Sequence, residues 1–255
     1  MNKFSRKTIS AIILLAGCVS VFSSCQHGSE SKLPQNTDTV SKPTARVLKE
    51  KVLTKAEQDA LTPDMVIQSL KEGNKRYTNN DLTLRDHSAL VRAAAAGQFP
   101  KALILSCIDS RVAVEDVFDK GIGDLFVGRV AGNFVNVDLL GSMEYACNVS
   151  GAKLILVLGH ESCGAIKSAI DNVKLGNITA MLAKIQPAVA ESMNFKGDKT
   201  SKNDAFVEYV ALNNIRNTIE TIKKQSPILK NMADKGQIKI IGAYYHLKTG
   251  EVVFL

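Results

Sequence analysis

Three short apolar runs constrain the fold of this chain more than any other feature. They are KALILS at 101–106, DLFVGRV at 124–130 and KLILVLG at 153–159. Each run is long enough for a buried strand and too short for a buried helix. Strands that are apolar on both faces are typical of parallel sheets covered by helices on both sides. The runs therefore predict a mainly parallel central sheet.

The segments between these runs have the apolar spacing of helices. We expect helices over 53–77, 88–97, 138–149, 165–176, 178–192 and 204–225, and a polar loop over 193–203. Two further strands are expected at 238–245 and 251–255, joined by a turn at 248–250. This alternation predicts an α/β fold, in which functional loops lie at the carboxyl ends of the strands.

The first 24 residues have the features of an export signal. A short basic segment, Met1–Lys7, precedes a mostly apolar run over 8–22 that is too short to span a bilayer comfortably. Leu15-Ala16-Gly17-Cys18 resembles a bacterial lipobox, and Phe22-Ser23-Ser24-Cys25 is a looser match at the end of the apolar run. We expect a lipoprotein-type signal peptide over 1–24, with Cys18 or Cys25 lipidated. A plain signal peptide with incidental cysteines is the alternative.

The next segment, 25–52, is rich in Ser, Thr, Lys, Gln and Pro and reads as a flexible tether. The rest of the chain, 53–255, is expected to form one folded domain. The expected location is the bacterial cell envelope or periplasm, with a lipid anchor as the only attachment to a membrane. Removing residues 1–24 reduces the net charge from +7 to +4, and no aromatic-rich basic stretch remains, so we expect no nucleic-acid partner.

Two of the predicted strands are followed directly by residue types that commonly serve as metal ligands. The run ending at Ser106 is followed by Cys107, and the run ending at Gly159 is followed by His160 and, three residues later, by Cys163. Two thiolates and an imidazole suit Zn²⁺. Three protein ligands leave a fourth tetrahedral position open, as in catalytic zinc sites.

Asp109 and Arg111 follow the first of these cysteines closely. A guanidinium can hold a carboxylate in a bidentate pair. Such a pair keeps Asp109 off the metal, although Asp109 is also a candidate fourth ligand in a closed state of the site. A disulfide between Cys107 and Cys163 is a serious alternative in an oxidising compartment, and a redox protein is a minor one.

Cys-x-Asp-x-Arg followed by His-x-x-Cys-Gly resembles the β-class carbonic anhydrases, zinc enzymes that interconvert CO₂ and bicarbonate. The resemblance covers about Asp64 to Leu255 and includes the run DLFVGRVAGN at 124–133. It implies the β-carbonic anhydrase fold, with an N-terminal helical arm. It also implies that Cys107, His160 and Cys163 are zinc ligands and that Asp109 and Arg111 form a catalytic pair.

The resemblance extends to the substrate pocket of the plant-type branch. It implies substrate-binding roles for four residues: Gln98, Phe126, Tyr145 and Gly164. The branch with a second, regulatory bicarbonate site has a Trp three positions before the first cysteine. This chain has Ile104 there and no Trp anywhere, so that regulatory site is not expected. Ala131 stands where relatives often carry a larger aliphatic residue.

Members of this family form dimers with active sites at the subunit interface. The resemblance therefore implies a homodimer or a dimer of dimers, in which the helices over 53–77 and 88–97 could be exchanged between subunits. A COS or CS₂ hydrolase on the same scaffold, or a non-enzymatic zinc-binding envelope lipoprotein, are the alternative functions.

Overall fold

A computed structural model of the chain describes residues 51–255. The predicted signal peptide, Cys18, Cys25 and nearly all of the predicted tether lie outside these residues. Within the described part, five strands form one sheet in the order β2-β1-β3-β4-β5. They are β1 (Ala102–Ser106), β2 (Leu125–Arg129), β3 (Leu154–His160), β4 (Lys239–Tyr245) and β5 (Val252–Phe254).

The sheet is parallel from β2 to β4, as the apolar runs predict, and β5 pairs antiparallel with β4. From β1 the chain continues to β2 on one side, and the strand on the other side of β1 is β3. The order of strands therefore reverses between β1 and β3. A crevice for ligands forms at the carboxyl ends of strands where such a reversal occurs.

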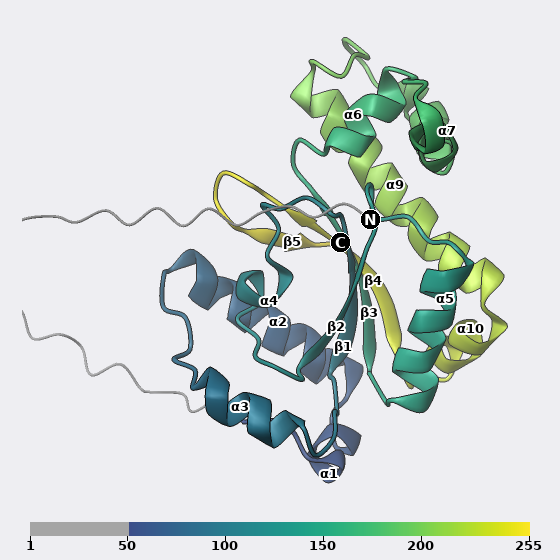
Figure 1. The fold of residues 1–255 in the computed structure, drawn as a ribbon. Coiled ribbons are helices and arrows are strands. Elements are labelled where there is room, and N and C mark those ends of the chain that lie inside the picture. The colour runs from purple at the N-terminus through teal and green to yellow at the C-terminus, as the bar shows by residue number, and fades with distance from the viewer. Residues whose placement is uncertain (1–50) are drawn as a thin grey trace, which may run out of the picture. The chain divides into compact units, whose positions relative to one another are not determined.

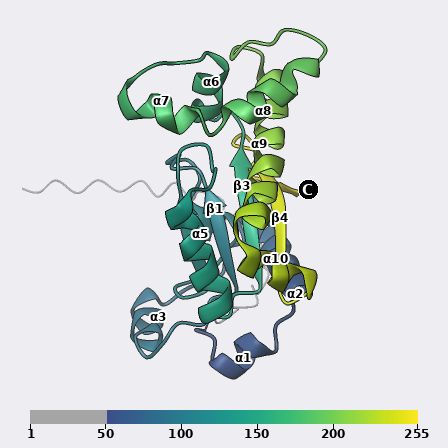
Figure 2. The same cartoon turned by 90° about the vertical axis from the view of Figure 1, so that its right-hand side faces the viewer.

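Helices cover both faces of the sheet (Figures 1 and 2). One face carries α2 (Pro63–Thr78) and α4 (Val114–Val117), and nearby are α1 (Lys55–Asp59) and α3 (His87–Ala94). The other face carries α5 (Val137–Glu144), its π-helical extension Tyr145–Val149, α9 (Asp204–Gln225) and α10 (Pro227–Asp234). The helices α6 (Gly164–Ile170), α7 (Gly176–Leu182), α8 (Gln186–Glu191) and the short turn Ser192–Asn194 lie between β3 and α9 in sequence.

The hydrophobic core has two layers, one on each face of the sheet, because successive side chains of a strand point to opposite faces. In β3, Leu154, Leu156 and Leu158 pack toward the α2 layer. Ile155 and Val157 pack toward the α9 layer. Both layers are fully buried along this strand, which explains its unbroken apolar sequence.

Several helix boundaries differ from the sequence-based prediction. The helix predicted over 53–77 is two helices, because Thr62 caps the amide of Met65 and Pro63 begins a new helix there. The helix predicted over 178–192 is likewise divided into α7 and α8. The helix α10 was not predicted, although Ser226 caps it and Pro227 occupies its first turn.

The two N-terminal helices are attached to their own chain. Gln58 of α1 donates through Nε2 to the carbonyl oxygens of Pro100 and Ser150, at 2.7 and 2.8 Å. Val66 and Leu70 of α2 are buried against the sheet. These contacts attach α1 and α2 to the core of their own chain, and the exchange of helices between subunits stays a prediction.

Asn74 of α2 connects three separate segments of the chain. Its Nδ2 donates to the carbonyl oxygens of Val117 and Gly250, at 3.1 and 2.8 Å, and its Oδ1 accepts from the amide of Val252 at 2.9 Å. Asn74 is 5% exposed, so water cannot replace these bonds. We expect Asn74→Ala to lower the free energy of unfolding by about 2–4 kcal/mol, because three buried backbone groups lose their partner.

Urea denaturation measures this effect. The matched control is Asn231→Ala, since Asn231 is exposed on α10. A loss of stability no larger than that of the control would contradict the role given to Asn74.

Candidate metal centre

Three potential metal ligands meet where the strand order reverses. Cys107 follows β1 directly, His160 is the last residue of β3, and Cys163 is the N-cap of α6. Ser162 has φ 52°, so the chain between the last two ligands turns through the left-handed region. The exposed fractions of the three are 4%, 1% and 1% in chain order, and the cluster is therefore closed off from bulk water.

The spacing of the ligand atoms fits a tetrahedral metal. One nitrogen of His160 and the two sulfurs all lie within 4.8 Å of one another. The Sγ atoms of Cys107 and Cys163 are 3.9 Å apart. Two sulfurs on one tetrahedral zinc, each at ~2.3 Å, would be about 3.8 Å apart, whereas a disulfide requires about 2.05 Å. Both thiols are free, and the disulfide alternative is wrong for this structure.

The orientation of His160 leaves one ring nitrogen free for a ligand. Its Nδ1 lies 2.9 Å from the carbonyl oxygen of Glu161 and donates to it in the tautomer that makes this bond. Its Nε2 is buried and has no hydrogen-bond partner among the described residues. A buried nitrogen without a partner is costly unless something coordinates it. A backbone acceptor on the other ring nitrogen is the usual arrangement of a metal-binding histidine.

The two thiols influence each other strongly. The Cys163 thiol, the neighbouring His160 and the Gly132 amide lower the pKa of Cys107 well below its ordinary value. The Gly132 N–H donates to Cys107 Sγ at 3.4 Å. The nearby Cys107 thiolate and burial raise the pKa of Cys163. One thiolate is therefore favoured before any cation binds, and a divalent cation would favour both.

Asp109 and Arg111 form the bidentate pair that the sequence suggests. Asp109 Oδ1 accepts from Arg111 Nε at 2.9 Å and from the Arg111 backbone amide at 3.0 Å. Asp109 Oδ2 accepts from Arg111 Nη2 at 2.7 Å and lies 3.9 Å from His160 Nε2. The carboxylate therefore lies beside the cluster while its two oxygens are held by the guanidinium.

Arg129, at the end of β2, also contacts this loop, and the sequence analysis did not single it out. Its guanidinium donates to the carbonyl oxygens of Cys107, Asp109 and Val112 at 2.7–2.8 Å. The available signal was a lone arginine ending an otherwise apolar strand. This signal is weak, because a charged residue at the end of a strand usually faces solvent.

Gln98, Phe126 and Tyr145 are not near the cluster within one chain. Gln98 precedes β1 and is exposed, whereas Cys107 follows β1, so the length of the strand, about 16 Å, separates them. Phe126 pairs with Leu103 in register, about three residues from the carboxyl end of the sheet. Gly164, by contrast, directly follows Cys163 and begins α6.

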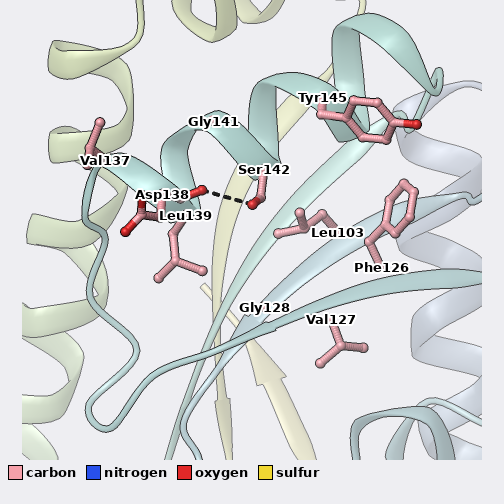
Figure 3. Close-up of a pocket in the computed structure, with 10 residues that line it drawn as sticks. All are labelled: Leu103, Phe126, Val127, Gly128, Val137, Asp138, Leu139, Gly141, Ser142 and Tyr145. Carbon is pink, nitrogen blue, oxygen red and sulfur yellow. Dashed lines mark hydrogen bonds between the residues drawn. The ribbon is translucent and has the colours of Figure 1, made fainter.

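Phe126 and Tyr145 instead line a groove between β2 and α5 (Figure 3). Their rings meet edge to face, with centroids 6.4 Å apart. The groove has a volume of about 810 Å³. Its exposed apolar residues include Val137 and Tyr145, which are 78% and 52% exposed.

Comparisons with known proteins agree with the site. The family model described as carbonic anhydrase matches residues 102–252. Carbonic anhydrase 2 of Mycobacterium tuberculosis is 35% identical over 73% of this chain and 89% of its own length. A carbonic anhydrase of Mycolicibacterium smegmatis is 34% identical over 72% of this chain and 89% of its own length.

The fold agrees as well. The solved β-carbonic anhydrase CcaA is 25% identical, with a TM-score of 0.58, over 75% of this chain and 93% of its own. A tetrameric β-carbonic anhydrase of Sordaria macrospora has a TM-score of 0.59 at 20% identity, over 75% of this chain and 94% of its own. This chain belongs to the β-class carbonic anhydrases. The matched segment includes both cysteines, His160, Asp109 and Arg111.

The Asp109–Arg111 pair makes a prediction about pH. The Arg111 guanidinium lowers the pKa of Asp109 to about 2. Because this value lies below that of an unfolded aspartate, the ionised carboxylate stabilises the fold above about pH 4, and this contribution is lost as the pH falls toward 2. In Arg111→Gln the pKa of Asp109 should rise toward 3.8, its ordinary value.

Carbon-13 NMR of the Asp109 carboxyl group measures this pKa. Arg216→Gln, at an exposed arginine on α9, is the control and should leave it unchanged. An Asp109 pKa that stays near 2 in Arg111→Gln would contradict the assignment. Since the Arg111 side chain is 54% exposed, solvent screens the pair and its effect on stability is small.

Proposed function

We propose that Cys107, His160 and Cys163 bind Zn²⁺ and that the protein catalyses the reversible hydration of CO₂ to bicarbonate and a proton. One observation carries this proposal: a buried Cys-His-Cys cluster with an unpartnered Nε2 lies beside a carboxylate held by an arginine. Two sulfurs and one nitrogen suit zinc better than magnesium or calcium, which prefer oxygen. Three protein ligands leave one position for solvent.

When bound, Zn²⁺ supplies a Lewis acid that lowers the pKa of a coordinated water, an effect for which carbonic anhydrase itself is the standard example. The residues of the chain supply the rest. The Asp109 carboxylate remains ionised at neutral pH because Arg111 lowers its pKa to about 2. Its Oδ2, 3.9 Å from His160 Nε2, can accept a hydrogen bond from an O–H group beside the cluster. Arg111 keeps this oxygen from ligating the metal.

A homodimer supplies the remaining parts of the proposed pocket. Gln98, Phe126 and Tyr145 are far from the cluster of their own chain and lie on surfaces that a second copy can reach. The exposed apolar groove between β2 and α5 is the surface that this copy would cover. We therefore place Gln98, Phe126 and Tyr145 at the active site of the other subunit. Gly164 stays with the cluster of its own chain.

Export to the cell envelope, with a lipid on Cys18 or Cys25, is part of the same proposal. It is supported by the basic start, the apolar run and the cysteines near its end. Residues 25–52 would then connect the anchor with the enzyme. Among residues 51–255, no helix combines the length and the apolar character needed to cross a bilayer.

Stopped-flow CO₂ hydration and zinc analysis test the proposed function. The wild type should hold about one zinc per chain and hydrate CO₂. Asp109→Asn should keep its zinc but lose about 100-fold or more in kcat, because the acceptor beside the cluster loses its charge. Cys163→Ser should lose zinc and stability together, since metal binding is coupled to folding.

The control is Asp234→Asn, since Asp234 pairs with Lys230 on the exposed side of α10. A metal-free wild type, or a wild-type rate in Asp109→Asn, would contradict the proposal. If zinc is bound but COS or CS₂ reacts in place of CO₂, the site is right and the substrate is wrong.

The dimer makes its own prediction. Val137→Glu places a charge on the apolar groove, where Val137 is 78% exposed in the single chain. We expect this variant to be monomeric by light scattering at micromolar concentration and to lose CO₂ hydration while its zinc content is unchanged. Ile228→Glu, at a 44% exposed position on α10, is the control. A monomeric wild type would reject the proposed dimer.

A further inference from the structure

A single side chain holds the backbone of the loop that carries both a proposed ligand and the proposed acceptor. Arg129 Nε donates to the carbonyl oxygen of Cys107 at 2.8 Å. Its Nη2 donates to the carbonyl oxygens of Asp109 at 2.7 Å and Val112 at 2.8 Å. One guanidinium therefore binds three carbonyl groups spread over six residues of the chain.

Among residues 51–255, this loop has few other hydrogen bonds to the rest of the protein. The Val112 amide donates to the Asp109 carbonyl at 3.2 Å, and the Arg111 amide donates to Asp109 Oδ1 at 3.0 Å, but both bonds lie within the loop. Cys107 and Val112 at the two ends of the loop are buried, whereas Ile108 between them is 62% exposed. Between these buried ends, the hydrogen bonds from Arg129 connect the backbone of the loop to β2.

The position of Asp109 then has two separate determinants. Arg111 fixes the carboxylate through its side chain, but Arg111 belongs to the same loop and moves with it. Arg129 belongs to β2, which is paired along its length with β1, and it connects the loop to the sheet. Arg129 therefore helps to set the distance between the Asp109–Arg111 pair and His160, which ends β3.

The geometry of arginine suits this task. The N–H groups of Nε and Nη2 form a rigid planar fork and can reach several acceptors at once. A lysine offers one nitrogen on a flexible stem, and it cannot reach three carbonyl oxygens in the same arrangement. The three acceptors are backbone atoms, so the contact fixes the main chain whichever side chains the loop carries.

We propose that Arg129 is a positioning residue for the hydration reaction, which holds the Cys107–Val112 loop so that Asp109 stays beside the cluster without ligating the metal. This inference rests on the proposed function for its effect on rate. Its structural part, the restraint of the loop by Arg129, can be measured on the protein whether or not CO₂ is the substrate.

The test compares Arg129→Ala and Arg129→Lys with the wild type. In Arg129→Ala, kcat should fall about 10- to 100-fold with KM unchanged, because small displacements of a catalytic group are costly. Zinc content and the urea midpoint should stay at wild-type values, since water can satisfy the released carbonyls. Free guanidinium ion at millimolar concentration should restore part of the rate, and Arg129→Lys should be intermediate.

A second readout does not depend on activity. Amide hydrogen exchange at Arg111 and Val112 should accelerate at least 10-fold in Arg129→Ala, while exchange in β1 is unchanged. Arg216→Ala is the control, since Arg216 is an exposed arginine with a hydrogen bond of its own, to Asn213. If Arg129→Ala does not fold, Arg129→Lys is measured in its place with the same expected directions.

The outcomes separate the two proposals. Wild-type kcat and wild-type exchange in Arg129→Ala would overturn the positioning role. A loss of activity that follows a loss of zinc or of folding, without rescue by guanidinium, would also overturn it and leave Arg129 merely structural. Faster exchange in the loop of a protein whose wild type does not hydrate CO₂ would support the restraint and refute the proposed function.

Discussion

The parallel pairing of β1 with β3 is the interaction on which the site depends. Its register places Ser106 opposite Leu158, so Cys107 and His160 emerge at the same edge of the sheet although 53 positions separate them in the chain. Parallel pairing sends both strands toward that edge, and the strand-order reversal leaves room there for Cys163 at the start of α6. An antiparallel or shifted pairing of the same strands would separate the ligands.

The burial of the three candidate ligands determines what this arrangement can do chemically. His160 Nε2 is buried without a hydrogen bond, and two thiols lie 3.9 Å apart. A buried nitrogen without a partner destabilises a folded chain unless a cation or a proton satisfies it. The cluster is therefore hard to explain as packing alone. The nearby Asp109 is different, because Arg111 neutralises it and half of that arginine faces solvent. The site thus combines a buried set of ligands with an ionised carboxylate whose arginine partner is half exposed.

The sequence was most informative where local chemistry decides the structure. Unbroken apolar runs predicted β1 to β3, and the long amphipathic segment predicted α9 at its observed bounds, Asp204–Gln225. The Asp109–Arg111 pair was predictable because its partners are two residues apart. Helix boundaries were harder, since Pro63 begins a helix where the apolar spacing alone suggests continuity. The π-helical turn Tyr145–Val149 has no signal in a 3.6-residue period.

Contacts between distant segments were beyond sequence reasoning. Arg129 lies 17 to 22 positions from the carbonyl groups it binds, and backbone acceptors leave no trace in residue identity. The same holds for Asn74, whose partners Val117, Gly250 and Val252 meet only when the β4–β5 hairpin closes over α2. Arg129 and Asn74 each use a polar side chain to bind main-chain atoms of distant segments. The ligands of a metal site can be identified from the sequence. The side chains that hold the ligand-bearing loops in place are found only once the path of the backbone is known.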